Sequence, residues 1–399
     1  MARRPTLDFL KTESGAGLLL AVAAVAAVTA ANSAFADRYF AFIAAPFPVR
    51  LGAFAETRSI LDWVKDGLMA IFFLVVGMEI KFEVLRGELS SPRRIALPVL
   101  AALGGMIAPA AIYLALNLGP HGAPHGWPIP TATDIAFALA ALAVAAPRMP
   151  GSLRVFLMTL AIADDLGGVA LIALLFTSKL HIVSLAGAGL TLAALALLSR
   201  WKRAPFLFYA AGFVAVWGFT LESGVNTSLA GVACALTVPI GARRAGQESV
   251  LKYFMDSLHP YVAFAVLPLF AFTAAGFSLR GLQAHDILAP MPSGVALALL
   301  IGKPLGVFGF SLLAVALRIG RRPAGTTWLE LLGVAMLCGV GFTMSLYIGA
   351  LAAGAGGALA QTQVRLAVAA GSLASALAGG ALLAWAQARR SERGEDVRD

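Results

Sequence analysis

Two adjacent acids, Asp164 and Asp165, lie in the middle of a long apolar segment at residues 156–176. The segment is long enough to cross a lipid bilayer as one helix, and carboxylates inside a bilayer are costly and mark functional sites. Successive side chains on a helix point about 100° apart, so the two acids can face different surroundings and take up protons at different pH. This pair could therefore exchange a cation against protons.

A structural hydrogen-bonding role is the alternative interpretation of Asp164 and Asp165. One acid would be enough for that role, and two close carboxylates repel each other. Burial and a neighbouring negative charge both disfavour the ionised form of a carboxylate. Such a site can hold protons and release them when a cation arrives.

A second polar sequence, residues 128–134, combines two prolines, two threonines and Asp134 at the start of another apolar segment. Proline removes a backbone donor and restricts the residue before it, so we expect a broken helix here. Its freed carbonyls and the Thr133 hydroxyl could coordinate a cation, and Asp134 could balance exposed helix ends. Alternatively, Thr133 or Asp134 simply caps an ordinary helix.

Lys303 lies deep in a third apolar segment. A lysine at the centre of a membrane helix costs about 2.5 to 3.5 kcal/mol on insertion scales, so it needs a partner, and Asp164 is our candidate. The alternative is that the Lys303 side chain reaches the membrane surface. A fourth segment is interrupted by Gly339 and Gly341, which predict another broken helix or, alternatively, close helix packing.

The composition defines the class of protein: 59% of the residues are hydrophobic, 13% are charged, and the mean hydropathy is +0.84. We expect an all-α polytopic membrane protein. The net charge of +9 does not indicate nucleic-acid binding, because the basic residues are scattered in short clusters between apolar segments. Cys234 and Cys338 lack the spacing of a disulfide or metal motif, and no cofactor is expected.

Apolar segments predict about twelve membrane-spanning helices in a single domain, residues 1–399. They lie at residues 15–35, 60–80, 95–117, 131–146, 153–177, 183–199, 205–221, 224–240, 258–278, 293–317, 327–352 and 361–386. The fourth and eleventh are the interrupted ones. Their positions suggest inverted repeats made of spans three to five and ten to twelve, with a transporter site at the membrane midplane.

Most lysines and arginines fall in the loops on the side of the two termini, which predicts that both termini are cytoplasmic. A signal peptide in residues 1–36 is the competing interpretation. Residues 37–58 could form an extracytoplasmic hairpin or a plain loop. Residues 387–399 are expected to be a charged, disordered cytoplasmic tail.

Several motifs together resemble the NhaA family of sodium/proton antiporters over nearly the whole chain. They lie at residues 68–81, 132–139, 164–167, 258–260, 267–272, 302–306 and 339–345. The resemblance implies electrogenic exchange of Na⁺ or Li⁺ for protons in a bacterial inner membrane, activated at high pH. It also implies a homodimer formed through residues 37–58.

The resemblance further implies a role for each site residue. Asp165 would be the main ligand of Na⁺ or Li⁺, with Thr133 nearby, and Asp164 would pair with Lys303 and exchange protons. Asp134 and Lys303 would compensate the ends of two crossed, broken helices.

Control by pH is the property in which the sequence departs from the family. Glu79, Lys81 and Glu83 match a cluster that the family associates with pH response, although a solvated helix end would look the same. Three positions differ from the expected pattern, with Phe82 in place of arginine, Met255 in place of glutamate and Asn226 in place of histidine. A histidine switch is therefore not expected.

Three other functions fit the placement of the ionisable residues less well. An intramembrane aspartyl protease needs two acids from facing helices that share a proton, whereas Asp164 and Asp165 are adjacent in one helix. A channel needs a continuous polar pathway or filter, and the sequence has one compact ionisable cluster. A symporter with the same fold remains the nearest alternative.

Overall fold

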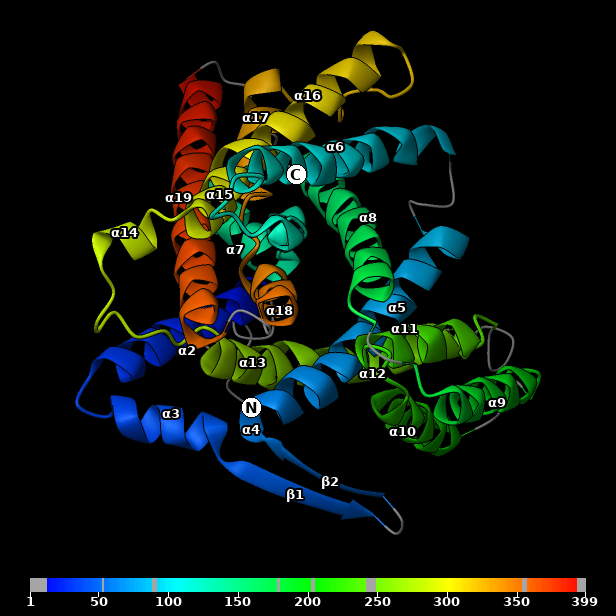
Figure 1. Cartoon of the computed structure of the whole chain (residues 1–399). Coiled ribbons are helices and arrows are strands. Elements are labelled where there is room, and N and C mark those ends of the chain that lie inside the picture. The colour runs from blue at the N-terminus through cyan, green and yellow to red at the C-terminus, as the bar shows by residue number, and fades with distance from the viewer. Residues whose placement is uncertain are drawn as a thin grey trace, which may run out of the picture. The chain divides into compact units, whose positions relative to one another are not determined.

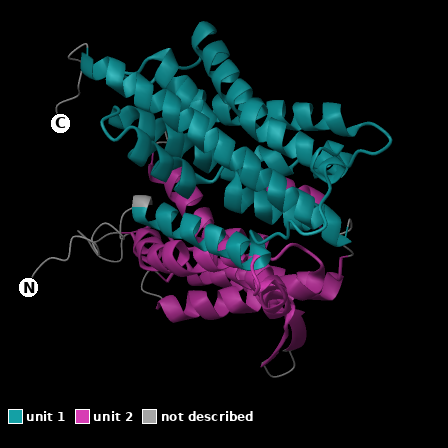
Figure 2. Cartoon of the chain, turned by 90° about the vertical axis from the view of Figure 1, so that its left-hand side faces the viewer, with its two compact units in different colours: residues 1–32, 91–168, 274–399 teal, residues 33–90, 169–273 magenta. Residues whose placement is uncertain are grey.

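The computed structural model describes residues 13–51, 54–87, 92–177, 180–201, 205–241, 249–353 and 357–392. These residues are mostly helical (Figure 1), as expected for apolar segments that must satisfy every backbone group internally. The chain forms two compact units (Figure 2). Unit 1 comprises residues 1–32, 91–168 and 274–399, and unit 2 comprises residues 33–90 and 169–273.

Within the described residues, seven helical segments are long and apolar enough to cross a membrane, or nine if each of two bent helix pairs counts as one span. The seven are α2 (Glu13–Asn32), α6 (Pro92–Asn117), α8 (Gly151–Leu175), α10 (Phe206–Ser223), α12 to α13 (Val250–Ala274), α15 to α16 (Pro290–Ala316) and α19 (Gly357–Glu392). The all-α polytopic fold is confirmed, and the count of twelve stays a prediction.

Three further helices coincide with predicted spans but do not meet the same standard of length and hydropathy. Helix α5 (Met69–Arg86) contains the charged residues Glu79, Lys81 and Glu83, while α9 (Ile182–Leu198) and α11 (Ser228–Thr237) are short. Helix α5 is thus charged at its C-terminal end, and α9 and α11 are shorter than a bilayer is thick.

Two pairs of helices in unit 1 are bent at the predicted breaks. The segment Pro124–Thr131 meets α7 (Ile135–Ala145) at 46°, and α17 (Trp328–Leu337) meets α18 (Phe342–Ala352) at 43°. Prolines 128 and 130 withhold backbone donors before the first break, and Gly339 and Gly341 occupy the second. The breaks leave helix ends in the interior of unit 1, where side chains must satisfy them.

Helix α16 (Lys303–Ala316) carries Lys303 into this interior and lies beside α6 (Figure 1). Their backbones touch at two glycines: a Cβ atom on Gly104 would collide with the Gly306 carbonyl, and one on Gly306 with the Gly104 carbonyl. Small residues let membrane helices approach this closely. Pro304 cannot donate a helical hydrogen bond, and a π-helical turn, Ala298–Gly302, directly precedes Lys303.

The last turns of α19 hold the start of α17. Arg390 Nε lies 3.2 Å from Glu330 Oε1, both side chains are buried, and Arg390 Nη2 donates to the Gly325 carbonyl. Glu330 also forms a capping box with Thr327 at the first turn of α17. The expected disordered tail is therefore wrong for residues 387–392, which are helical because Arg390 is anchored there, and residues 393–399 lie outside the described residues.

Replacing Arg390 with alanine should destabilise unit 1, because Glu330 would keep a buried charge without its partner. Breaking one side of a buried ion pair costs on the order of 3 kcal/mol. Thermal unfolding in detergent measures the loss. Arg389→Ala is the matched control, since Arg389 stacks on Trp385 at 3.9 Å and makes no buried ion pair in the described structure. Equal shifts in Tm for the two variants would contradict the anchoring role.

Unit 2 begins with α3 (Ala36–Ala44) and a two-stranded antiparallel hairpin, β1 (Pro46–Leu51) and β2 (Phe54–Ser59). Its register pairs Pro46 with Ser59. The hairpin is shorter than the range predicted, 37–58, because residues 36–44 form a helix with a buried face. Whether it faces the extracytoplasmic side stays a prediction.

The hairpin is fixed to the helices that follow it, α4 (Ile60–Trp63) and a π-helical turn, Val64–Leu68. Arg58 Nη1 lies 2.9 Å from Asp66 Oδ2, and Trp63 Nε1 donates to the Phe47 carbonyl at 2.7 Å. The hairpin is therefore anchored at its base to the helices that follow it.

Candidate cation and proton site

Seven of the predicted site residues lie together in the interior of unit 1. They are Thr133, Asp134, Asp164, Asp165, Lys303, Gly339 and Gly341. All seven are buried. The other three predicted residues, Glu79, Lys81 and Glu83, lie on α5 in unit 2.

Lys303 forms the centre of a buried hydrogen-bonded chain. Its Nζ lies 2.6 Å from Asp164 Oδ2, and both side chains have 0% of their surface exposed. The same Nζ donates to Thr133 Oγ1 at 2.9 Å. Thr133 Oγ1 in turn donates to the Cys338 carbonyl at 2.9 Å. The chain connects α16, α8 and both breaks, and the Lys303 side chain is enclosed by protein.

Asp134 joins the first turns of two helices. As the N-cap of α7, it accepts a hydrogen bond at Oδ1 from Phe137 N at 3.1 Å. Its Oδ2 accepts from Thr343 N at 3.0 Å and from Thr343 Oγ1 at 2.5 Å, in the first turn of α18. A carboxylate at a helix N-terminus offsets the partial positive charge of the unpaired amides, and here one carboxylate serves two helices.

The two breaks also cross through their backbones. Asp134 N donates to the Val340 carbonyl at 2.7 Å. This bond and the Asp134 carboxylate place the starts of α7 and α18 together. The Cys338 carbonyl, at the end of α17, accepts from Thr133 Oγ1, to which Lys303 Nζ donates. Negative charge therefore lies at helix N-termini, and positive charge lies near a helix C-terminus, as the helix dipole favours.

The glycines of the second break are required by close approach of other atoms. A Cβ atom on Gly339 would collide with the Leu299 carbonyl, and one on Gly341 would lie 2.9 Å from the Ala132 carbonyl. Gly341 N donates to Ser372 Oγ at 3.2 Å, so α19 satisfies an amide that the break leaves without a helical acceptor.

Thr343 and Ser372 are the site residues that the sequence prediction missed. Thr343 lies within a motif that was recognised, but a threonine next to a glycine-rich break gives no sign of which acid it binds. Ser372 lies in a long helix whose serines have no distinctive spacing. Only the crossing in three dimensions assigns their partners.

Asp165 is 4% exposed and follows Asp164 on α8. Among the described residues, no group of three or more His, Cys, Asp or Glu side chains could hold a metal ion. The oxygen atoms that meet at Lys303 belong to the Asp164 carboxylate and the Thr133 hydroxyl. Oxygen ligands of this kind suit hard cations rather than soft transition metals.

In unit 2, Lys81 and Asn226 hold the two ends of α11. Lys81 Nζ donates to the Leu236 carbonyl at 2.6 Å and to the Val238 carbonyl at 2.5 Å, at the C-terminal end. Asn226 Oδ1 accepts from Ser228 N at 3.0 Å, at the N-terminal end. The Asn226 amide oxygen thus binds the first residue of α11.

Asp134→Asn should impair both the structure of the crossing and any transport that depends on it. Asparagine has one acceptor oxygen and one NH₂ group, which is a donor. The NH₂ group would therefore lie against the backbone N–H of either Phe137 or Thr343, and two donors would point at each other. Losing a charged acceptor for buried amides costs about 1.5 to 3 kcal/mol. We expect a lower Tm in detergent and transport reduced by about tenfold or more.

Asp286→Asn is a matched control for the Asp134 variant. Asp286 is also an acid that caps a helix in unit 1, but it forms the capping box of α14 (Ala284–Ile287), away from the two breaks. Unchanged stability and transport in Asp134→Asn would show that the shared carboxylate does not support the crossing.

Comparison with known proteins identifies the family. The Na⁺/H⁺ antiporter 1 family model matches residues 7–383. The Na⁺/H⁺ antiporter NhaA 1 of Syntrophotalea carbinolica is 45% identical over 388 residues, covering 97% of this chain and 98% of the relative. The corresponding antiporter NhaA of Paramagnetospirillum magneticum is 47% identical over 379 residues, with 94% and 95% covered. The chain belongs to the Na⁺/H⁺ antiporter 1 family.

Proposed function

We propose that this chain is an electrogenic secondary antiporter that exports Na⁺ or Li⁺ from the cell in exchange for protons. The observation that carries the proposal is the buried pair of acids, Asp164 and Asp165, beside a buried ammonium in a chain whose relatives are named sodium/proton antiporters. Carboxylates at this depth are costly in the absence of a function.

In this proposal, cation and protons compete for the same carboxylates. Asp165 is the main cation ligand, and Thr133 contributes oxygen. The arriving cation displaces the proton of Asp165, separates Asp164 from Lys303 and releases a second proton from that pair; when the cation leaves, both protons are taken up and the ion pair re-forms. Because binding of one substrate requires release of the other, export needs no separate energy source.

The same proposal covers the membrane topology, the dimer and the response to pH. The protein spans the bacterial inner membrane many times with both termini in the cytoplasm, as the distribution of basic residues favours. Two copies associate through the hairpin of unit 2. Glu79, Lys81 and Glu83 contribute to the response to pH, without a titrating group at position 226.

Proton movement in everted membrane vesicles tests the exchange. Vesicles acidified by respiration receive Na⁺, Li⁺ or K⁺ at a series of pH values, and a fluorescent dye reports the internal pH. Alkalinisation by Na⁺ and Li⁺ supports antiport, and competition predicts that the apparent KM for Na⁺ falls as pH rises.

Vesicles from cells without the protein are the control for leaks. No response to any cation from well-expressed protein at any pH would exclude antiport. Sodium entry accompanied by another solute, with no proton movement, would instead indicate symport.

A further inference from the structure

Ser375 is a fully buried serine on α19 that the exchange chemistry does not use. Its Oγ donates a long hydrogen bond, 3.4 Å, to the carbonyl of Leu299. Leu299 belongs to the π-helical turn Ala298–Gly302, and Lys303 is the residue that directly follows this turn. The hydroxyl therefore joins α19 to the backbone that carries Lys303.

The Leu299 carbonyl needs a side-chain donor because the two regular backbone donors do not serve it. In an α-helix its partner is the N–H four positions later, but the N–H of Lys303 donates to the Ala298 carbonyl. In a π-helix the partner is the N–H five positions later, and residue 304 is a proline, which has none. Leu299 is 0% exposed, and a buried carbonyl without a partner is costly. The Ser375 hydroxyl thus supplies the donor that Pro304 withholds.

The glycine at the second break leaves room for this contact. A Cβ atom on Gly339 would collide with the Leu299 carbonyl and would lie 2.5 Å from Ser375 Oγ. One turn before Ser375 on α19, Ser372 Oγ accepts a hydrogen bond from Gly341 N at 3.2 Å. Two serines on one face of α19 therefore bind two segments of the site, the π-helical turn and the second break.

The π-helical turn determines the direction of the Lys303 side chain. Its hydrogen bond spans one residue more than that of an α-helix, so each side chain after the turn is rotated by about 100° relative to an uninterrupted α-helix. Lys303 Nζ lies 2.6 Å from Asp164 Oδ2 and 2.9 Å from Thr133 Oγ1. Both bonds require this direction, and a turn with an unsatisfied carbonyl is less firmly held in it.

We propose that Ser375 is a positioning residue of the exchange site: by binding the Leu299 carbonyl, it holds the π-helical turn in the register that directs Lys303 to Asp164. The proposal rests on the function proposed above, in which the cation and Lys303 compete for Asp164. A less firmly held ammonium competes less well with the cation. Loss of the hydroxyl should therefore lower the apparent KM for Na⁺.

Ser375→Ala in everted vesicles tests this role. Na⁺-dependent alkalinisation, measured over a range of Na⁺ concentrations, should give an apparent KM about fivefold below that of the wild type. A smaller amount of folded protein would lower the maximal rate and leave the KM unchanged. The KM therefore separates positioning of Lys303 from a general effect on folding.

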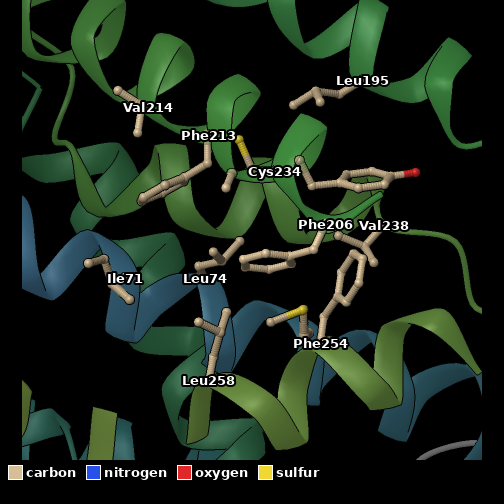
Figure 3. A pocket seen from close by; sticks show the side chains of 13 residues that line it. Ile71, Leu74, Leu195, Phe206, Phe213, Val214, Cys234, Val238, Phe254 and Leu258 are labelled. Carbon is tan, nitrogen blue, oxygen red and sulfur yellow. The ribbon is translucent and has the colours of Figure 1, made fainter. Parts of the chain in front are cut away.

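Two control variants should retain the wild-type KM. Ser311→Ala also removes a buried hydroxyl in unit 1, but Ser311 Oγ donates to the Val307 carbonyl within its own helix, α16, at 2.6 Å. Phe213→Ala enlarges an apolar cavity in unit 2 (Figure 3) and should lower the Tm alone. An unchanged or higher KM in Ser375→Ala, or the same decrease in either control, would overturn the proposal.

The hydrogen bond itself is tested by a double-mutant cycle with Pro304→Ala, which gives residue 304 an N–H. The Leu299 carbonyl then has a backbone donor, so Ser375→Ala should lower the Tm in detergent by about half as much, or less, in this background as in the wild type. Equal losses of Tm in the two backgrounds would overturn the proposal. The cycle needs no transport: a wild type that exchanges nothing would contradict the function proposed above, and the cycle would still decide the assignment of Ser375.

Discussion

Asp165→Asn should abolish cation-dependent proton movement, with activity lowered by about a hundredfold or more, which corresponds to roughly 2.7 kcal/mol. Asparagine has nearly the shape of aspartate, so the buried position on α8 remains filled. It cannot ionise, however, and so it neither carries the charge that binds a cation nor takes up the proton that replaces it.

Everted vesicles that contain equal amounts of wild type and variant give the measurement. Asp256→Asn is the control, because Asp256 is exposed on α12 and lies in unit 2. It should transport as the wild type does. Substantial Na⁺-dependent alkalinisation by Asp165→Asn would show that the cation binds elsewhere.

Lys303→Met should cause the largest loss of stability of any single change considered for unit 1. Methionine fills a similar volume, but Asp164 would remain in the interior without its ammonium. Removing one member of a fully buried ion pair costs about 3 to 5 kcal/mol. The variant can reduce this cost only by keeping a proton on Asp164, which becomes harder as pH rises. Its deficit in Tm should therefore grow from acidic to alkaline pH.

A double variant separates the cost of an unpaired charge from the value of the pair. Asp164→Asn combined with Lys303→Met removes both charges, so most of the stability should return and the dependence on pH should disappear. Thermal unfolding in detergent at a series of pH values gives the Tm of the wild type, of Lys303→Met and of the double variant. A double variant as unstable as Lys303→Met would mean that packing, rather than the unpaired carboxylate, explains the loss.

Much of this site could be predicted because placing ionisable residues inside a membrane costs free energy. Asp164, Asp165 and Lys303 are visible as charges in apolar segments, and the same cost that makes them visible requires them to have partners. Pro128, Pro130 and the glycines at 339 and 341 likewise indicate where a helix cannot continue. Local chemistry is sufficient for these predictions.

The contacts between segments could not be predicted in the same way. Nothing in the order of residues shows that Asp134 binds Thr343, or that α19 supplies Ser372 to Gly341, because these pairs depend on how the helices cross. The tail was misjudged for a similar reason. Its charge suggested disorder, but Arg390 is buried beside Glu330, an acid more than fifty positions earlier in the chain.

The shared carboxylate of Asp134 also limits how the protein can move. Pulling the first turn of α7 away from that of α18 would break hydrogen bonds to Thr343, and bonds to a charged acceptor contribute about 1.5 to 3 kcal/mol each. The backbone bond from Asp134 to Val340 would break as well. The starts of α7 and α18 should therefore move together rather than apart.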